Sequence, residues 1–248
     1  VRDGNVYVIE VNPRSSRTVP FLSKVTTVPM VDVATKCAMG ISIREQGYKP
    51  GLGYFPDYYA CKAPVFSFNK MSNVDITLGP EMKSTGEVMC VDYQYSRALY
   101  KACIASGIDV PDEGSILITV ADQDKPEAVE IAAGFKELGY NVVATEGTAA
   151  YLKEHGVEVQ VAIKVSEDTH PNIIDHIKEG DVGMIINTSN HGRDAERDGF
   201  KIRRCSVEHA IPCLTSMDTA RELQRVMAAM RHRRIVSIVA LQDLSWER

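Results

Sequence analysis

The sequence predicts an α/β protein whose second half is a doubly wound parallel sheet, a three-layer αβα arrangement with helices on both faces. Two observations lead to this prediction. After residue 111, short apolar segments rich in β-branched residues alternate with segments of helical period. Strands that are buried on both faces form continuous apolar runs, and parallel strands require crossover connections, usually helices. The composition agrees, because 44% hydrophobic and 25% charged residues over 248 positions are typical of a globular protein.

Strands and helices are expected to alternate from residue 115 onward. The expected strands are residues 115–121, 141–145, 157–163, 182–188, 211–215 and 235–241. The expected helices are residues 126–139, 148–156, 170–180, a segment near 200–210, and 217–230. Because these elements make one complete sheet with its covering helices, we expect residues 112–248 to form one domain.

The first half of the chain is less regular. Strand–turn–strand character is expected for residues 1–11, helices for 31–41 and 95–107, and a strand for 65–71. Gly, Pro and Tyr dominate the stretch from 47 to 64, and turn residues interrupt 78–89. With so little regular core, residues 1–111 are expected to be part of a larger domain, and the chain, which begins at Val1, to be a fragment.

Composition and charge exclude several classes of partner. A formal net charge of -5 provides no general attraction for nucleic acid or anionic lipid. The longest apolar runs are far shorter than the roughly 20 residues that a membrane helix needs. The cysteines show no Cys-x-x-Cys spacing and no Cys/His ligand pattern, which favours reduced thiols in a cytoplasmic protein. We therefore expect neither a nucleic-acid partner nor a membrane partner.

Glu10 and Asn12 form the first candidate site. They stand two residues apart in a segment of strand character, so alternation places both side chains on one face. A carboxylate and an amide oxygen are hard ligands suited to Mg²⁺ or Mn²⁺ carrying nucleotide phosphates. Arg14 and Arg17 follow closely enough to reach phosphate oxygens. Taken alone, the Glu-x-Asn pattern fits a solvated strand end better than a metal site.

The carboxyl edge of the predicted parallel sheet forms the second candidate site, because ligands of such folds bind outside the carboxyl ends of the strands. Residue types that bind phosphate or ribose hydroxyls follow the first four expected strands: Lys125, Thr145, Thr148, Lys164, Asn187 and Ser189. Gly147 permits close backbone approach, and Thr148 opens a helix whose free N–H groups attract an anion.

Each of these residues also has a simpler explanation. The threonines could be helix caps, the lysines solvated surface charges, and Asn187 a turn former. For any one residue alone the simpler explanation is favoured. Their joint placement on one edge of the sheet favours a phosphate-bearing ligand.

Two long segments carry a family resemblance. IEVNPRSSRTVPFLSKVT (9–26) resembles the last catalytic strand of ATP-grasp ligases, and its extension narrows the resemblance to carbamoyl-phosphate synthase. SFNKMSNVDITLGPEMKSTGEVM (67–89) resembles the segment of that enzyme that joins its second ATP-grasp unit to its allosteric domain. The resemblance implies an ATP site at which Glu10 and Asn12 hold Mg or Mn, and at which Arg14 and Arg17 assist catalysis. Residues 1–111 would then be the tail of that ATP-grasp unit with the connecting segment.

The second half resembles a methylglyoxal-synthase-like domain, which in carbamoyl-phosphate synthase receives nucleotide effectors. The resemblance implies that UMP or IMP contacts the residues of the carboxyl edge, with the phosphate near Thr145, Thr148 and Lys164. It also implies a small glutaminase subunit as partner, an oligomer, and a role in pyrimidine and arginine biosynthesis. Ornithine activation is not expected, because Ala63 stands where activated relatives carry a glutamate.

Two other functions were weighed against this one. A methylglyoxal-synthase-type lyase needs catalytic aspartates in its phosphate loops, and the fourth strand here ends Ile186-Asn187-Thr188 without one. Methylglyoxal synthase also carries no EVNPRSSR segment ahead of its domain. A free-standing nucleotide-binding regulatory module, split from the catalytic half, would be expected to begin with Met and to contain a whole ATP-grasp unit. A fragment of the ligase subunit, regulatory but not catalytic by itself, explains both halves.

Overall fold

A computed structural model describes residues 3–8, 10–51, 56–71, 74–79, 81–165, 169–188, 198–231, 238–240 and 243. The chain divides into two compact units, Val1–Asp57 with Ile238–Arg248, and Tyr58–Ser237. The two units are described separately below.

The second unit contains the predicted parallel sheet. Its five strands are ordered β5-β4-β3-β6-β7, and all neighbouring pairs are parallel. Their bounds are β3 Ser115–Thr119, β4 Asn141–Thr145, β5 Gln160–Ala162, β6 Val182–Asn187 and β7 Cys213–Leu214. The expected α/β architecture is thereby confirmed for the described part of the chain.

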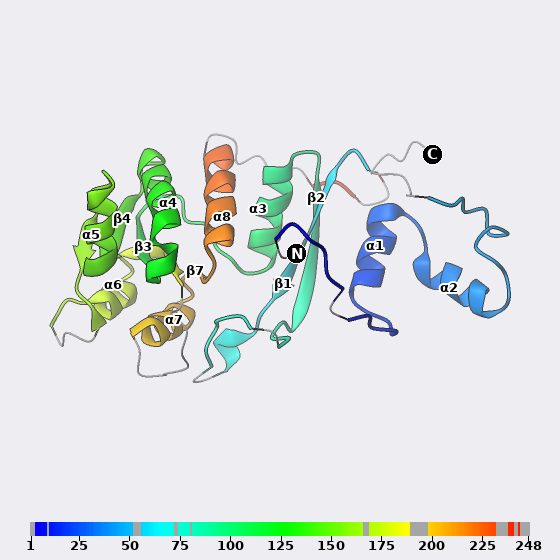
Figure 1. The fold of residues 1–248 in the computed structure, drawn as a ribbon, viewed down its shortest axis with the longest axis horizontal. Coiled ribbons are helices and arrows are strands. Elements are labelled where there is room, and N and C mark those ends of the chain that lie inside the picture. Colours follow the sequence, from blue (N-terminus) through cyan, green and yellow to red (C-terminus); the bar gives the residue numbers. More distant parts are fainter. Residues whose placement is uncertain are drawn as a thin grey trace. The chain divides into compact units, whose positions relative to one another are not determined.

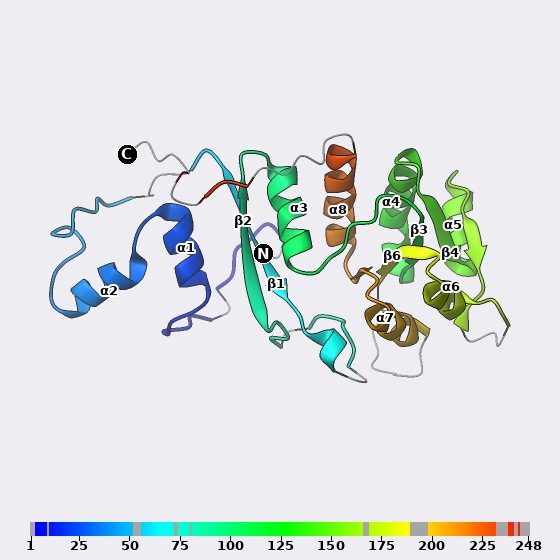
Figure 2. The same ribbon diagram turned by 180° about the vertical axis from the view of Figure 1, so that it is seen from behind.

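Helices cover both faces of this sheet, as Figures 1 and 2 show, with α4, α5 and α8 on one side and α6 and α7 on the other. Their bounds are α4 Lys125–Glu137, α5 Glu146–Glu154, α6 Ile173–Glu179, α7 Asp198–Glu208 and α8 Met217–Met230. A short 3-10 helix, η2 (Asp122–Asp124), leads into α4. The arrangement is the predicted three-layer one.

The alternation of side chains along β3 explains the two covered faces. Ile116 and Ile118 belong to the core on the side of α4, α5 and α8, together with Phe135. Leu117, between them, belongs to the core on the side of α6 and α7. Successive strand residues point to opposite faces, so a continuous apolar run fills two cores at once.

Some of the predicted elements differ from those of the structure. The predicted strand 157–163 is paired only over β5, Gln160–Ala162. The predicted helix 170–180 begins at Ile173, because Asn172 caps it and exchanges a capping box with Asp175. The predicted last strand, 235–241, lies mostly outside the described residues, and residues 238–240 carry no regular structure.

The second unit also contains a small antiparallel sheet, which the sequence did not predict. Strand β1 (Tyr59–Val65) pairs with β2 (Gly86–Asp92), and α3 (Tyr95–Ala105) follows, close to the helix expected at 95–107. Pro64 is tolerated in β1 because each strand of a two-stranded sheet has a free edge. The predicted strand 65–71 is wrong: the chain turns at Ser67 into a 3-10 helix, η1 (Phe68–Lys70).

Helix α3 shares a core with the parallel sheet. Tyr100 and Cys103 of α3, and Val110 after it, belong to the same buried cluster as Ile116 and Phe135. The residues on both sides of the expected domain boundary, 111 and 112, therefore lie in one compact unit. The division into 1–111 and 112–248 remains a prediction.

The first unit has little internal packing. Its helices are α1 (Thr18–Thr26), which was not predicted, and α2 (Met30–Ala38), which was; neither contains a buried residue. The strand–turn–strand expected at the start of the chain does not form in the described residues 3–8 and 10–11, where Asn5 makes only an isolated bridge. Val6 and Val8 are 82% and 80% exposed.

Candidate functional site

The carboxyl ends of the strands bring the predicted site residues to one edge of the sheet. Thr119 at the end of β3 is in register with Asn187 at the end of β6, and Thr145 at the end of β4 is in register with Ala162 at the end of β5. Lys125 and Lys164 each follow one of these strand ends within a few residues.

Thr145 and Thr148 form the turn between β4 and α5. The hydroxyl of Thr145 donates to the hydroxyl of Thr148 over 3.3 Å, and Thr148 is only 2% exposed. Thr145 is the N-cap of α5 in an extended conformation, but its side chain makes no capping hydrogen bond to the backbone of the first turn. The turn is therefore not a simple capped helix start. The orphan backbone N–H groups of a helix N-terminus attract an anion.

Lys125 reaches from the end of β3 towards this turn. A Cβ added to Gly147 would lie 3.7 Å from the Lys125 Nζ, so the ammonium group stands beside the start of α5. The same Nζ pairs with Asp122 at 2.6 Å. Hydrogen bonding to Lys125, together with its charge, lowers the pKa of the Asp122 carboxyl. An anionic ligand would compete with this exposed carboxylate for the lysine.

Lys164 lies two residues beyond β5 and is half-buried. Because β5 neighbours β4, this lysine follows the strand end next to the Thr145 turn. Ser189, the remaining predicted contact, lies outside the described residues, as does most of the polar loop that follows it.

Asn187 takes part in a buried polar network that the sequence did not reveal. Its Oδ1 accepts a hydrogen bond from Arg203 Nη1 at 2.7 Å, and Arg203 is paired with Asp75. Thr188 is also engaged: its hydroxyl accepts from the backbone N–H of Ala121 at 2.9 Å, which ties the end of β6 to the end of β3. Asp122, Arg203 and Asp75 were missed at the sequence level, and only Asp122, three residues from Lys125, carried a local signal.

The other candidate site belongs to the first unit. Asn12 Nδ2 donates to Glu10 Oε1 at 3.0 Å, so the two side chains lie together as their spacing predicted. Glu10, Asn12, Arg14 and Arg17 are all exposed. Arg17 stands at the N-cap of α1, and the Arg14 backbone N–H donates to the Asn12 carbonyl. Their roles at an ATP site remain predictions.

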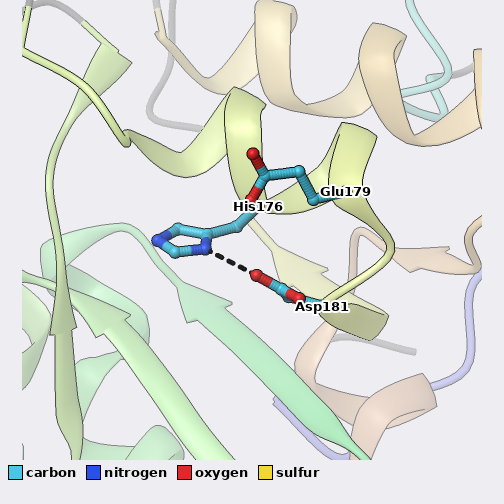
Figure 3. Close-up of side chains that lie close together, drawn as sticks. All are labelled: His176, Glu179 and Asp181. Carbon is cyan, nitrogen blue, oxygen red and sulfur yellow. Dashed lines mark hydrogen bonds and ion pairs between the residues drawn. The ribbon is translucent and has the colours of Figure 1, made fainter.

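Among the described residues, a third group of possible metal ligands lies at the end of α6 (Figure 3): His176, Glu179 and Asp181, whose ligand atoms lie within 4.8 Å of one another. His176 Nδ1 is 3.0 Å from Asp181 Oδ2. Both carboxylate residues are exposed, and none of the predicted site residues belongs to this group. Exposed acidic groups often lie together without a metal ion, so this group alone does not indicate a metal site.

A cleft in the second unit lies at the opposite edge of the sheet. Its lining includes Val110 and Asp112, which precede β3, and Tyr140, which precedes β4, together with Met230 and Arg231 at the end of α8. Ligands of doubly wound sheets bind at the carboxyl ends of the strands. The cleft is therefore distinct from the candidate effector site at the carboxyl edge of the sheet. Part of that candidate site, Ser189, lies outside the described residues.

Two protein families match the chain in order. Residues 1–46 match the ATP-binding domain of the carbamoyl-phosphate synthase L chain, and residues 127–215 match the MGS-like domain. This order of matches agrees with the predicted resemblance to the C-terminal portion of the carbamoyl-phosphate synthase large subunit. Its predicted fold class, a methylglyoxal-synthase-like αβα domain preceded by the tail of an ATP-grasp domain, agrees with both matches and with the five-stranded sheet. The match over residues 1–46 is to an ATP-binding domain, which supports the expected similarity to ATP-dependent ligases.

A solved structure described as "Crystal structure of ForH" is similar to 47% of the chain and 79% of that chain, at 19% identity and a TM-score of 0.34. A likeness at this identity and TM-score supports no conclusion about the function of this chain. In the described residues, no helix is both long and apolar enough to cross a membrane.

Proposed function

We propose that this chain is the C-terminal part of the large subunit of a glutamine-hydrolysing carbamoyl-phosphate synthase, and that its αβα domain binds a nucleotide effector, UMP or IMP. The parent enzyme makes carbamoyl phosphate from bicarbonate and glutamine-derived ammonia with ATP, for pyrimidine and arginine biosynthesis. Its partner is a small glutaminase subunit, and the assembly is a cytoplasmic oligomer. Residues 1–46, which match the ATP-binding domain, would supply only part of an ATP site, so this chain by itself would not be catalytic.

The observation that carries the effector proposal is the arrangement around the start of α5. The Lys125 ammonium stands beside Gly147, and the Thr145 side chain bonds Thr148 instead of capping the helix. A phosphate at this point would meet a positive charge, two hydroxyl groups and the N–H groups of a helix N-terminus. A methylglyoxal synthase-type lyase is not supported, since β6 ends in Ile186-Asn187 without an aspartate.

Ligand binding at this edge would rearrange one ion pair. The phosphate would draw the Lys125 Nζ away from Asp122, whose side chain is 90% exposed and loses little when it returns to water. Lys164, on the neighbouring strand end, would supply a second positive charge. Two lysines facing one phosphate favour a dianionic monophosphate over a neutral nucleoside.

Glu10 and Asn12 are proposed as ligands of Mg or Mn at the ATP site. Their chemistry fits such an ion, because a carboxylate and an amide oxygen are hard donors. The amide now turns its nitrogen towards Glu10, and the exposed Asn12 side chain is free to rotate and offer its oxygen instead. Bound there, the ion would neutralise phosphate charge, while Arg14 and Arg17 would contact phosphate oxygens. Both arginines are therefore proposed to assist catalysis.

The effector proposal is tested by calorimetric titration of this chain with UMP and IMP. Lys164→Ala should weaken binding by roughly tenfold to a hundredfold, the effect of losing a hydrogen bond between charged groups. Lys153→Ala, which removes a lysine at the far end of α5, is the matched control and should bind as tightly as the unaltered chain. The proposal is wrong if neither nucleotide binds at millimolar concentration, or if Lys164→Ala has no effect.

The metal proposal is tested in the full-length subunit. Glu10→Ala should abolish ATP-dependent carbamate phosphorylation, because water cannot replace the charge of a bridging carboxylate. Nucleotide binding to the αβα domain should be unchanged in the same variant. Near-normal synthesis of carbamoyl phosphate would remove Glu10 from the site.

A further inference from the structure

Arg203 is a buried cation that connects two distant segments of the second unit. It lies on α7, which contacts β6 and β7, and it is only 5% exposed. Its Nε and Nη2 donate to the two carboxylate oxygens of Asp75 at 2.8 and 2.7 Å. Its Nη1 donates to Asn187 Oδ1 at 2.7 Å. The guanidinium thus joins the segment between β1 and β2 to the carboxyl end of β6.

The Arg203 contact fixes which end of the Asn187 amide faces which way. A guanidinium has only donors, so it can accept nothing from the amide nitrogen. The oxygen must therefore face Arg203, and the NH₂ group must face away from it. Asn187 is 2% exposed, so water cannot readily replace Arg203 as the partner of that oxygen.

We propose that Arg203, held in place by Asp75, is a positioning residue of the effector site: it orients Asn187 so that the end of β6 offers a hydrogen-bond donor to the ligand. The site at this strand would then select a ligand group that accepts a hydrogen bond, such as a phosphate, hydroxyl or carbonyl oxygen. This inference rests on the proposed nucleotide binding at the same edge.

Asp75 is the residue that makes Arg203 rigid. A carboxylate that accepts two parallel N–H bonds sets the plane of the guanidinium as well as its position. Asp75 is itself held, because its Oδ1 accepts from the backbone N–H and the hydroxyl of Thr77, each at 3.0 Å. Partial burial alone would raise the pKa of the Asp75 carboxyl, but the hydrogen bonds from Arg203 and Thr77 outweigh it and lower the pKa to about 2. The pair is therefore charged at any physiological pH.

The network has a consequence for coupling. If the ligand engages the Asn187 amide, it favours the conformation in which Arg203 and Asp75 are paired. Binding free energies are reciprocal, so a change at Asp75 must alter ligand affinity to the same degree that the ligand alters the pairing. The segment from 74 to 79 would thus respond to the effector without touching it.

Titration with UMP and IMP tests the proposal in the whole chain. Asp75→Asn should lower the affinity about two- to thirtyfold, the range for network residues that contact no ligand. Glu208→Gln is the matched control, since it removes the carboxylate partner of the adjacent Arg204 on the same helix and should leave affinity unchanged. Asp75→Glu, which keeps the charge, should restore part of the lost affinity even if Asp75→Asn folds poorly.

A second readout separates positioning from a purely structural role. The side-chain NH₂ resonances of Asn187 should move in Asp75→Asn and not in Glu208→Gln, before any ligand is added. Unchanged resonances, or unchanged affinity of Asp75→Asn for a nucleotide that the unaltered chain binds, would overturn the proposal. If the unaltered chain binds neither nucleotide, the proposed function is wrong, and so is the proposal that Asn187 donates to a nucleotide. The resonances still decide whether Asp75 positions Asn187.

Discussion

The two compact units differ in how much of their sequence serves the fold. In Tyr58–Ser237, apolar residues of the parallel sheet fill cores on both faces, and Ile116, Leu117 and Ile118 are almost fully buried. In the described part of Val1–Asp57, no residue of α1 or α2 is buried, and Val31 is 65% exposed. The first unit contains the segment 9–26 with its Glu-x-Asn motif, whereas the buried apolar cores lie in the second unit. A sequence motif can thus identify an active-site segment whose own fold is not secured by local packing.

The largest expected effect comes from separating the two units. A polypeptide of residues 58–248 should unfold in one cooperative thermal transition followed by circular dichroism, because it keeps both cores. A polypeptide of residues 1–57 should show no such transition. A sharp thermal transition of residues 1–57 would show that this unit is stabilised by its own packing, contrary to the difference described above.

The predicted domain boundary can be sharpened in the same experiment. A polypeptide of residues 112–248 should still fold but melt at a lower temperature than residues 58–248. It loses Tyr100, Cys103 and Val110, which belong to the core shared with β3 and α4. Equal melting temperatures would mean that α3 contributes nothing to that core.

Single substitutions in the two units should differ in the same direction, with a large loss of unfolding free energy in the second unit and a small one in the first. Phe135 is fully buried and meets Tyr140 edge-to-face at 6.0 Å, so Phe135→Ala should cost about 3–5 kcal/mol of unfolding free energy. Val31→Ala, at an exposed position of α2, should change it by less than about 0.5 kcal/mol. Urea titrations of the whole chain would measure both, and a large effect at Val31 would contradict the account.

Acid should weaken the Asp75–Arg203 pair. The pKa of Asp75 is lowered from its ordinary 3.8 to about 2, so the stability it contributes is present above pH 4 and is lost as the pH falls towards 2. After allowance for its partial exposure, this contribution is about 1–2 kcal/mol. The unfolding free energy of Asp75→Asn should therefore fall less steeply over this range, as measured by urea titration at each pH. If the unfolding free energies of the two proteins fell equally steeply with pH, the lowered pKa of Asp75 would be contradicted.

The sequence predicted the parallel sheet well because its strands are continuous apolar runs such as Ile116–Ile118. Its helices repeat apolar residues at helical spacing, as Ile131 and Phe135 of α4 show. It missed β1, whose residues include Lys62 and Pro64, because a half-buried strand of a small two-stranded sheet shows no continuous apolar run. Five described residues predicted for the effector edge lie at strand ends of one sheet, as expected. The Arg203–Asp75 contact could not be predicted, because the two residues lie 128 positions apart and neither belongs to a local motif.

The most direct test of the central claim is where a nucleotide binds on this chain. Backbone amide resonances would be recorded while UMP or IMP is added to the whole protein. The account predicts saturable shifts for Gly147 and Thr148 at the start of α5 and for Lys125, with the amides of α1 and α2 unmoved. Shifts confined to other elements, or a chain whose α5 resonances do not respond at millimolar nucleotide, would contradict it.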